Sequence, residues 1–174
     1  TADLAQDLRA STFHPPTLDF LDKLGIADQL VEQGLICKHW QFRDRNTGVV
    51  ASFDLSLLTG ETKFPFRLQC EQWKLTKALR TYIEDHPDGE LITRTSAEEV
   101  GQNDDGVWVN TIDSEGYKNR YEGRFLIGSD GARSIVRKSI NAKFEGMTIP
   151  EIFLVLSTNF QYEKAIPDLA NIAY

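Results

Sequence analysis

Residues 125–137 read FLIGSDGARSIVR and carry the most informative pattern in the chain. The stretch opens with a compact apolar run at 125–127, passes through a turn bounded by glycines, and continues from Ser134 in a helical pattern. The sequence therefore predicts a strand, a tight turn and a helix over residues 125–140. The amides of a first helical turn lack partners and attract anions, so this junction is a candidate phosphate site.

A purely structural interpretation of the same turn stays open at this point. Ser134 is a residue type that caps helix amino termini well, and Asp130 is common wherever a chain turns. On this interpretation the two side chains only terminate the helix and the turn.

The chain before this stretch predicts helices that alternate with a hairpin. Apolar residues at helical spacing predict two short helices between Pro15 and Gly34, with a break at Gly25. Alternation on both sides of a turn at 46–48 predicts a β-hairpin over 37–55, and 57–66 is expected to be a loop. Residues 71–84 carry an apolar residue at every fourth position and predict a helix that stops before Pro87.

The apolar period then changes from 3.6 to 2. Short runs at 91–93, 107–112 and 117–121 are divided by turn residues, which predicts an antiparallel meander over about 97–123. A buried strand is expected over 152–160. These elements together indicate a mixed α/β fold, in which the helix at 71–84 and the strand at 125–127 belong to a nucleotide-binding layer beside the meander.

The composition and net charge of the chain limit the classes of partner that it is expected to bind. The 174 residues are 41% hydrophobic and 26% charged, with a net charge of −7, which is typical of a soluble globular protein and argues against nucleic acid or an anionic membrane as the main partner. The longest apolar run, 152–156, is far too short to span a membrane. No signal-peptide pattern opens the chain, which looks like an interior part of a longer gene product. Cys37 and Cys70 form no CxxC motif and are expected to be reduced thiols of a cytoplasmic protein.

Several further residues have ordinary structural interpretations. His14 precedes two prolines and is expected in a loop, while His39 and His86 have no ligand cluster at metal-binding spacing, so no metal site is expected. The three tryptophans are expected to pack in the core and sheet; they are Trp40, Trp73 and Trp108.

The segment at 128–137 resembles the internal Asp-Gly motif of the single-component flavin-dependent aromatic hydroxylases, the family typified by para-hydroxybenzoate hydroxylase. The family motif is approximately GxDGxxSxxR, and every fixed position is matched here. Two more segments are similar in order and spacing: LRA at 8–10 leading to PPTLDFL at 15–21, and LQ at 68–69 leading to the helix at 71–84. The resemblance spans essentially the whole chain.

The resemblance implies a set of cofactor-binding residues. Arg9 matches the arginine that holds the FAD diphosphate, a role suited to a bidentate guanidinium. Gln69 matches a glutamine that contacts FAD. Asp130 and Gly131 match the pair linked to both FAD and the nicotinamide cofactor, and Arg137 is the expected positive partner of a phosphate or of Asp130. No residue is nominated as a catalytic acid or base.

The sequence also departs from the family pattern. No GxGxxG fingerprint occurs, so the first βαβ unit of the Rossmann-like FAD fold is expected to be missing, and no later Gly-Asp-Ala motif follows. Residues 1–145 are expected to form a partial FAD-binding domain, and 146–174 the start of a substrate-binding sheet. We expect the isolated chain to bind FAD weakly, to lack hydroxylase activity and to self-associate through exposed strand edges.

The function implied by the resemblance is an FAD-dependent monooxygenase that consumes NADH or NADPH and hydroxylates a phenolic or similar aromatic substrate with O₂, through a flavin hydroperoxide. The flavin cofactor carries out the redox and oxygen-transfer chemistry, so few catalytic side chains are needed. Two alternatives stay open: a non-oxygenating flavoprotein of the same fold, such as a halogenase, cyclase or dehydrogenase, and a flavin-free α/β binding module.

Overall fold

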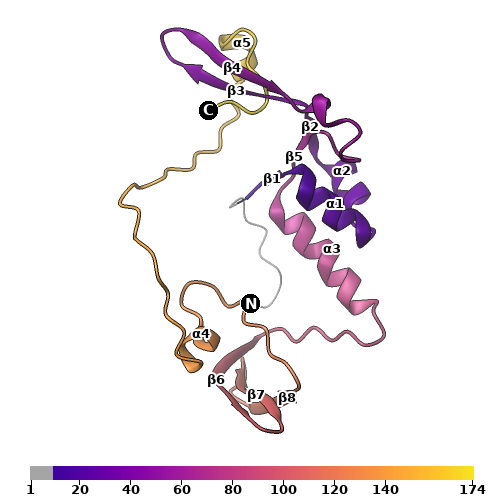
Figure 1. Cartoon of the computed structure of the whole chain (residues 1–174), viewed down its shortest axis with the longest axis vertical. Helices are drawn as coiled ribbons and strands as arrows, with labels where there is room; N and C mark the ends of the chain where they lie inside the picture. Colours follow the sequence, from indigo (N-terminus) through magenta and orange to yellow (C-terminus); the bar gives the residue numbers. More distant parts are fainter. Residues whose placement is uncertain (1–9) are drawn as a thin grey trace. The chain divides into compact units, whose positions relative to one another are not determined.

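The computed structural model describes residues 10–174, which divide into two compact units. Residues 10–91 and 156–174 form the first, here called the helical unit, and residues 92–155 form the second, here called the meander unit. Figure 1 labels the elements of both units. Within the described residues no helix is both long enough and apolar enough to cross a membrane.

The helical unit opens with a short strand and two helices. Strand β1 (Thr12–Phe13) leads into α1 (Pro15–Lys23), and α2 (Ala27–Gln33) follows. Prolines suit the first positions of α1 because those positions need no amide hydrogen. The predicted break is confirmed at Gly25, whose φ of 70° lies in the left-handed region that glycine adopts readily.

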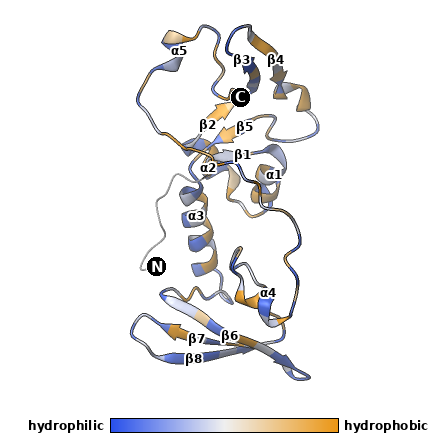
Figure 2. Ribbon diagram, turned by 90° about the vertical axis from the view of Figure 1, so that its left-hand side faces the viewer, coloured by the Kyte–Doolittle hydropathy of each residue, from blue (hydrophilic) through white to orange (hydrophobic). Residues whose placement is uncertain are grey.

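A three-stranded antiparallel sheet packs against these helices. Its order is β1, β5 (Arg67–Gln69), β2 (Leu35–Cys37), and helix α3 (Gln72–Glu84) follows β5, as the apolar spacing predicted. Figure 2 shows β2 as a strongly hydrophobic strand. The buried core of the unit comes from all of these elements and from the loop before β5: Phe13, Leu18, Leu21, Ile26, Ala27, Leu30, Phe64, Phe66, Leu68 and Cys70.

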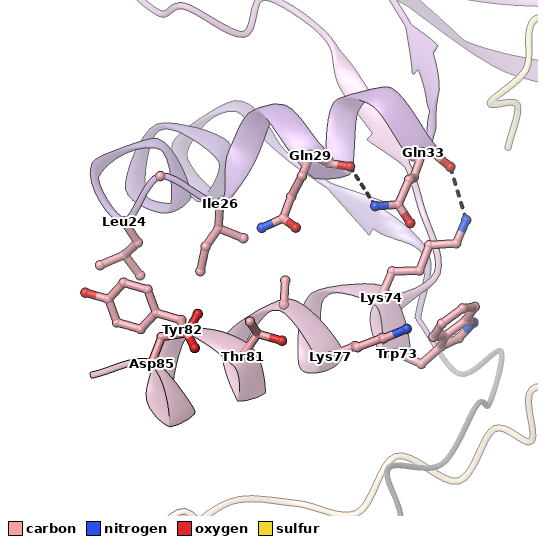
Figure 3. Close-up of a pocket in the computed structure, with 12 residues that line it drawn as sticks. Leu24, Ile26, Gln29, Gln33, Trp73, Lys74, Lys77, Thr81, Tyr82 and Asp85 are labelled. Atoms are coloured by element: carbon pink, nitrogen blue, oxygen red, sulfur yellow. Dashed lines mark hydrogen bonds between the residues drawn. The ribbon is translucent and has the colours of Figure 1, made fainter. Parts of the chain in front are cut away.

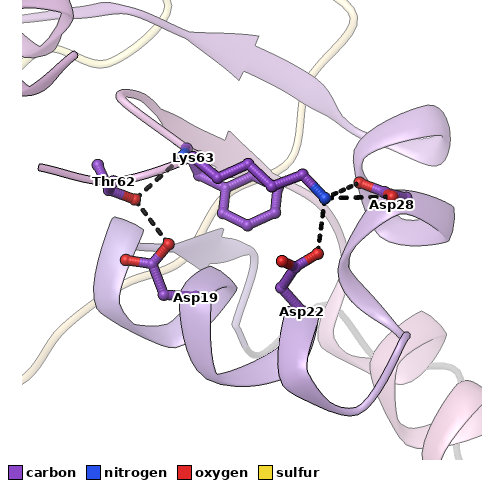
Figure 4. Close-up of polar contacts among 6 residues, drawn as sticks. Asp19, Asp22, Asp28, Thr62 and Lys63 are labelled. Carbon is purple, nitrogen blue, oxygen red and sulfur yellow. Dashed lines mark hydrogen bonds and ion pairs between the residues drawn. The ribbon is translucent and has the colours of Figure 1, made fainter. Parts of the chain in front are cut away.

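The loop before β5 is tied to α1 and α2 by polar contacts (Figure 4). The ammonium of Lys63 lies 2.7 Å from the carboxylate of Asp22 and 3.2 Å from that of Asp28. The hydroxyl of Thr62 donates to Asp19 at 2.7 Å. These contacts are partly exposed, so each is worth little alone, but together they fix the loop that delivers Phe64 and Phe66 to the core.

The predicted hairpin is confirmed as β3 (His39–Asp44) and β4 (Gly48–Asp54), followed by the 3₁₀ helix η1 (Leu55–Leu58). The turn is closed by Asp44, whose carboxylate accepts the N–H groups of Asn46 and Thr47 at 2.9 Å each. The C-terminal segment, after the short helix α5 (Tyr162–Ala165), runs beside β3. There the N–H of Tyr174 donates to the carbonyl of Gln41 at 2.9 Å.

The meander unit contains the predicted antiparallel meander. Strands β6 (Thr95–Asn103), β7 (Gly106–Asp113) and β8 (Lys118–Gly123) pair in sequence order, and α4 (Ile135–Ser139) follows. The hydrophilic strand β8 is exposed along its whole length (Figure 2). The run at 91–93 does not form the first strand, which begins at Thr95.

Two predicted strands are wrong for this structure. Residues 125–127 and 152–160 have no strand pairing, and Ile127 and Ile152 are 88% and 96% exposed. A strand is stable only beside a partner that takes its backbone hydrogen bonds, and none of the described residues pairs with either run. The apolar character of the two runs predicted burial, and within residues 10–174 the runs are exposed.

Candidate cofactor and substrate site

The Asp-Gly turn of the meander unit is organised by the carboxylate of Asp130. One oxygen accepts the hydroxyl hydrogen of Ser134, and the other accepts the N–H of Ile135 at 2.7 Å and of Val136 at 3.3 Å. The Ser134 oxygen accepts the N–H of Arg137 at 2.9 Å. The hydrogen bond from Ser134, helped by the two backbone donors, holds the pKa of Asp130 below its usual range. Asp130 is therefore ionised and closes the amino end of α4.

This arrangement corrects the expectation that the first amides of the helix are free for an external anion. The Asp130 carboxylate already takes those of Ile135 and Val136. The expected pair between Arg137 and Asp130 does not form either. The Arg137 guanidinium instead donates to the carbonyl of Ala132 at 3.0 Å and lies over the ring of Phe144, 4.6 Å from its centre.

Glycine is favoured at the two motif positions for different structural reasons. A Cβ added at Gly128 would lie 2.7 Å from the side chain of Val136, so this glycine permits close packing against α4. Gly131 has a φ of 78°, and a Cβ there would meet no heavy atom within 4 Å. The backbone at Gly131 is therefore open to a ligand on the side where another residue would carry its side chain.

In the helical unit, Gln69 lies at the end of β5 and its amide is held from one side. Its carbonyl oxygen accepts the hydroxyls of Thr12 at 3.0 Å and Ser11 at 3.3 Å. Among the described residues nothing accepts a hydrogen bond from the amide nitrogen, and the side chain is only half-buried. Gln69 thus presents a positioned donor to solvent.

Arg67 shares that face of the sheet with Gln69. Strand alternation points Leu68, which is fully buried, toward the core and its two neighbours toward the opposite face. Phe13 pairs with Leu68, so the following residue, His14, comes beside Arg67. Desolvation and the Arg67 charge lower the pKa of His14, which keeps this imidazole neutral near pH 7.

The Arg67 guanidinium lies beside two aromatic rings, 4.5 Å from the centre of Trp40 and 6.0 Å from that of Tyr174. With Phe42 and Phe53, which pack against Trp40, these rings form a group here called the aromatic cluster. The rings of Trp40 and Phe53 stack with centres 4.1 Å apart, and Tyr174 meets Trp40 edge-on at 5.8 Å. Trp40 packs in the sheet as expected, against Phe53, its partner across the hairpin. It is only half-buried, and Phe42 and Tyr174 are exposed. Sequence reasoning missed Arg67 and this cluster.

The predicted site residues belong to different units of the structure. Gln69 belongs to the helical unit, and Asp130, Gly131 and Arg137 belong to the meander unit. Arg9 lies outside the described residues. The part of the chain that the structure describes contains no group of three His, Cys, Asp or Glu side chains placed to hold a metal ion.

A cavity of about 460 Å³ lies between the α1–α2 connection, α2 and α3, and contains none of the predicted residues (Figure 3). Lys74 crosses its end, donating to the carbonyl of Gln33 at 3.1 Å and pairing with Glu71 at 2.7 Å. These contacts satisfy Lys74 within the unit, while Lys77 and Asp85 also line the cavity.

The chemistry of the donors fits FAD. An isoalloxazine ring carries carbonyl and ring-nitrogen acceptors, which suit the free amide hydrogens of Gln69, and the open backbone at Gly131 allows close approach of a large planar or phosphate-bearing group. Gln69 in the helical unit and Gly131 in the meander unit thus each present, taken separately, a group of the kind that FAD can contact.

Comparison with known proteins gives the class. The model of the FAD binding domain family matches residues 1–171, and the chain therefore belongs to that family. Among curated relatives, para-nitrophenol 4-monooxygenase of Pseudomonas sp. strain WBC-3 is 31% identical over 158 residues, covering 91% of this chain and 38% of that protein. The 6-hydroxy-3-succinoylpyridine 3-monooxygenase of Pseudomonas putida is 31% identical, covering 90% and 40%.

Solved structures agree on the fold. The crystal structure of p-nitrophenol 4-monooxygenase from Pseudomonas putida DLL-E4 matches with a TM-score of 0.78 and 28% identity, covering 84% of this chain and 37% of that one. A flavin-dependent monooxygenase solved with FAD and substrate matches with a TM-score of 0.70 at 22% identity, which supports the fold alone. The chain thus spans about two fifths of the curated relatives it matches first.

Proposed function

We propose that this chain is the cofactor-binding part of an FAD-dependent monooxygenase that hydroxylates a phenolic or similar aromatic substrate and consumes NADH or NADPH. The observation that carries the proposal is the family match over residues 1–171 together with relatives that are aromatic-compound monooxygenases. The partners proposed are a small aromatic compound and O₂. A cytoplasmic location is part of the proposal, supported by two free cysteines and no disulfide among the described residues.

The chemistry proposed for bound FAD is hydride acceptance from NAD(P)H followed by O₂ activation as a hydroperoxide, so that one oxygen atom enters the ring and the other leaves as water. The side chains of this chain bind and orient. Gln69 would donate to the flavin, Arg9 would bind the diphosphate, and Asp130 with Gly131 would contact the cofactors through the turn before α4. Arg137 would contribute a positive charge near a phosphate. The division at residue 145, with the substrate-binding sheet starting at 146, belongs to the same proposal.

The experiment is a three-part assay of the purified enzyme that contains this chain. Flavin per polypeptide is measured by absorbance, NADH and NADPH oxidation are followed with and without phenols, and O₂ uptake is compared with hydroxylated product. Substrate-stimulated oxidation with one hydroxylated product per O₂ supports the proposal. Flavin without oxygen insertion favours the halogenase, cyclase or dehydrogenase alternative, and absence of flavin favours a binding module.

A further inference from the structure

We propose that Arg67 and the aromatic cluster form a recognition surface for an aromatic ring that bears a negative charge, with Arg67 selecting the anionic form. This inference deepens the proposed function and rests on it. It makes Arg67 a specificity-determining residue of the monooxygenase substrate site.

The guanidinium of Arg67 is held in a fixed position. It lies over the ring of Trp40, 4.5 Å from the ring centre, and donates to the hydroxyl of Tyr174 at 3.2 Å. These two contacts come from β3 and from the C-terminal segment, which are joined by backbone hydrogen bonds at Gln41. Arg67 is therefore oriented before any ligand arrives, which reduces the entropy lost on binding.

Arg67 forms no ion pair with any carboxylate of residues 10–174, although the chain as a whole carries a net charge of −7. Lys63, Lys74 and Arg120 do have carboxylate partners. Arg43 and Arg137, which also have none, donate to backbone carbonyls instead. A half-buried guanidinium without a counter-ion favours an anion that brings one, and its donors suit carboxylate or phenolate oxygens.

The aromatic cluster supplies exposed ring faces and edges at the spacing that aromatic pairs prefer, with centres 4.1 to 5.8 Å apart between Trp40 and its three neighbours. A flat ligand ring can extend this stack while its anionic substituent meets Arg67. The neutral His14 adds no competing positive charge, so Arg67 decides the charge preference of this face.

Arg67 and Gln69 lie two positions apart on β5 and face the same side of the sheet. If Gln69 contacts the flavin, a ring bound at Arg67 lies on the flavin side of the sheet. The aromatic cluster alone would bind neutral and anionic rings alike.

The test measures equilibrium binding to the flavin-loaded enzyme at pH 8, with para-nitrophenol as the anionic probe and its methyl ether, 4-nitroanisole, as the uncharged probe. Calorimetric titration gives the dissociation constant of each. We expect Arg67→Met to weaken para-nitrophenol binding about 10-fold to 100-fold and to change 4-nitroanisole binding less than about 3-fold. Arg67→Lys keeps the charge but loses the fork, and should retain a reduced preference for the anion.

Arg120→Met is the matched control, because the Arg120 guanidinium also lies over a tryptophan ring, 4.4 Å from the centre of Trp108, but is paired with Glu122. This control variant should leave the dissociation constants of both probes unchanged. Equal losses for both probes in Arg67→Met, an unchanged anion preference, or no binding of either probe to the unmodified enzyme would overturn the inference. Loss of flavin from Arg67→Met would overturn it too, since Arg67 would then hold the cofactor. Absence of flavin from the unmodified enzyme would instead count against the proposed function.

Discussion

The carboxylate of Asp130 accepts the backbone N–H of Ile135 at 2.7 Å, and this contact occupies the position at which an external anion would meet the first turn of α4. The helix thus carries its own anion. An anion at the amides of Ile135 and Val136 would have to displace this ionised carboxylate. Asp130 itself is therefore suited to accept hydrogen bonds from uncharged groups, such as ribose or ribityl hydroxyls.

Replacement of the motif residues should reduce flavin retention selectively. We expect Asp130→Ala and Arg9→Ala to lower the flavin content of the purified enzyme severalfold, because both are proposed to lie at the cofactor. Asp104→Ala is the control, since Asp104 is exposed in the turn between β6 and β7. Flavin absorbance per polypeptide measures the effect, and equal retention in all three variants would remove both residues from the site.

Gly131 allows a ligand contact to be separated from backbone strain. Gly131 and Gly116 both have positive φ, 78° and 91°, and a Cβ at either would meet nothing within 4 Å. Alanine should therefore cost a similar amount of unfolding free energy at both, about 1 kcal/mol. Only Gly131→Ala should also weaken flavin binding, because only there would the new methyl group meet the cofactor. Equal flavin affinity of the two variants would show that the space beside Gly131 stays empty.

Local signals predicted the helices and hairpins well. The breaks at Gly25 and Gly34, the helix at 72–84 and the meander turns depend on residues close in sequence, and the structure confirms them. The strands predicted at 125–127 and 152–160 failed because strand formation depends on a pairing partner, which a run of apolar residues does not specify.

In the candidate site, too, local sequence signals predicted the local geometry but not the contacts between distant residues. The Asp-Gly motif is contiguous, so its capping geometry was one of two open interpretations and is now visible at Asp130. The surface at Arg67 brings together residues 40, 67 and 174, which meet only through the register of β2 with β5 and of β3 with the C-terminal segment. The alternation in β5, with a buried Leu68 between Arg67 and Gln69, was the one local signal available.

Leu30 should be among the most stabilising side chains of the helical unit. It lies on α2, is fully buried, and belongs to the core cluster. Leu30→Ala removes apolar contacts and leaves a cavity, and we expect a loss of about 2 to 5 kcal/mol in unfolding free energy. Leu57→Ala is the control, because Leu57 is 83% exposed and should change stability by less than about 0.5 kcal/mol. Urea denaturation measures both, and a small effect at Leu30 would contradict the packing described here.

The two cysteines should be unreactive in the folded protein. Cys37 and Cys70 are 3% and 2% exposed, and burial raises the pKa of both thiols, more than the nearby Lys74 charge lowers that of Cys70. We expect alkylation by iodoacetamide at pH 8 to be at least about 100-fold slower than in denaturant, because the thiolate is the reacting form and must also be exposed.

A raised thiol pKa means that folding favours the protonated form. The associated stabilisation is complete below the ordinary thiol pKa of about 8.5 and is lost as pH rises through the higher folded values. Unfolding free energy should therefore fall from about pH 8 upward, and Cys37→Ala with Cys70→Ala should flatten that fall in urea titrations. Rapid alkylation of the native protein, or an unchanged slope in the double variant, would show that these thiols are not held in the core as described.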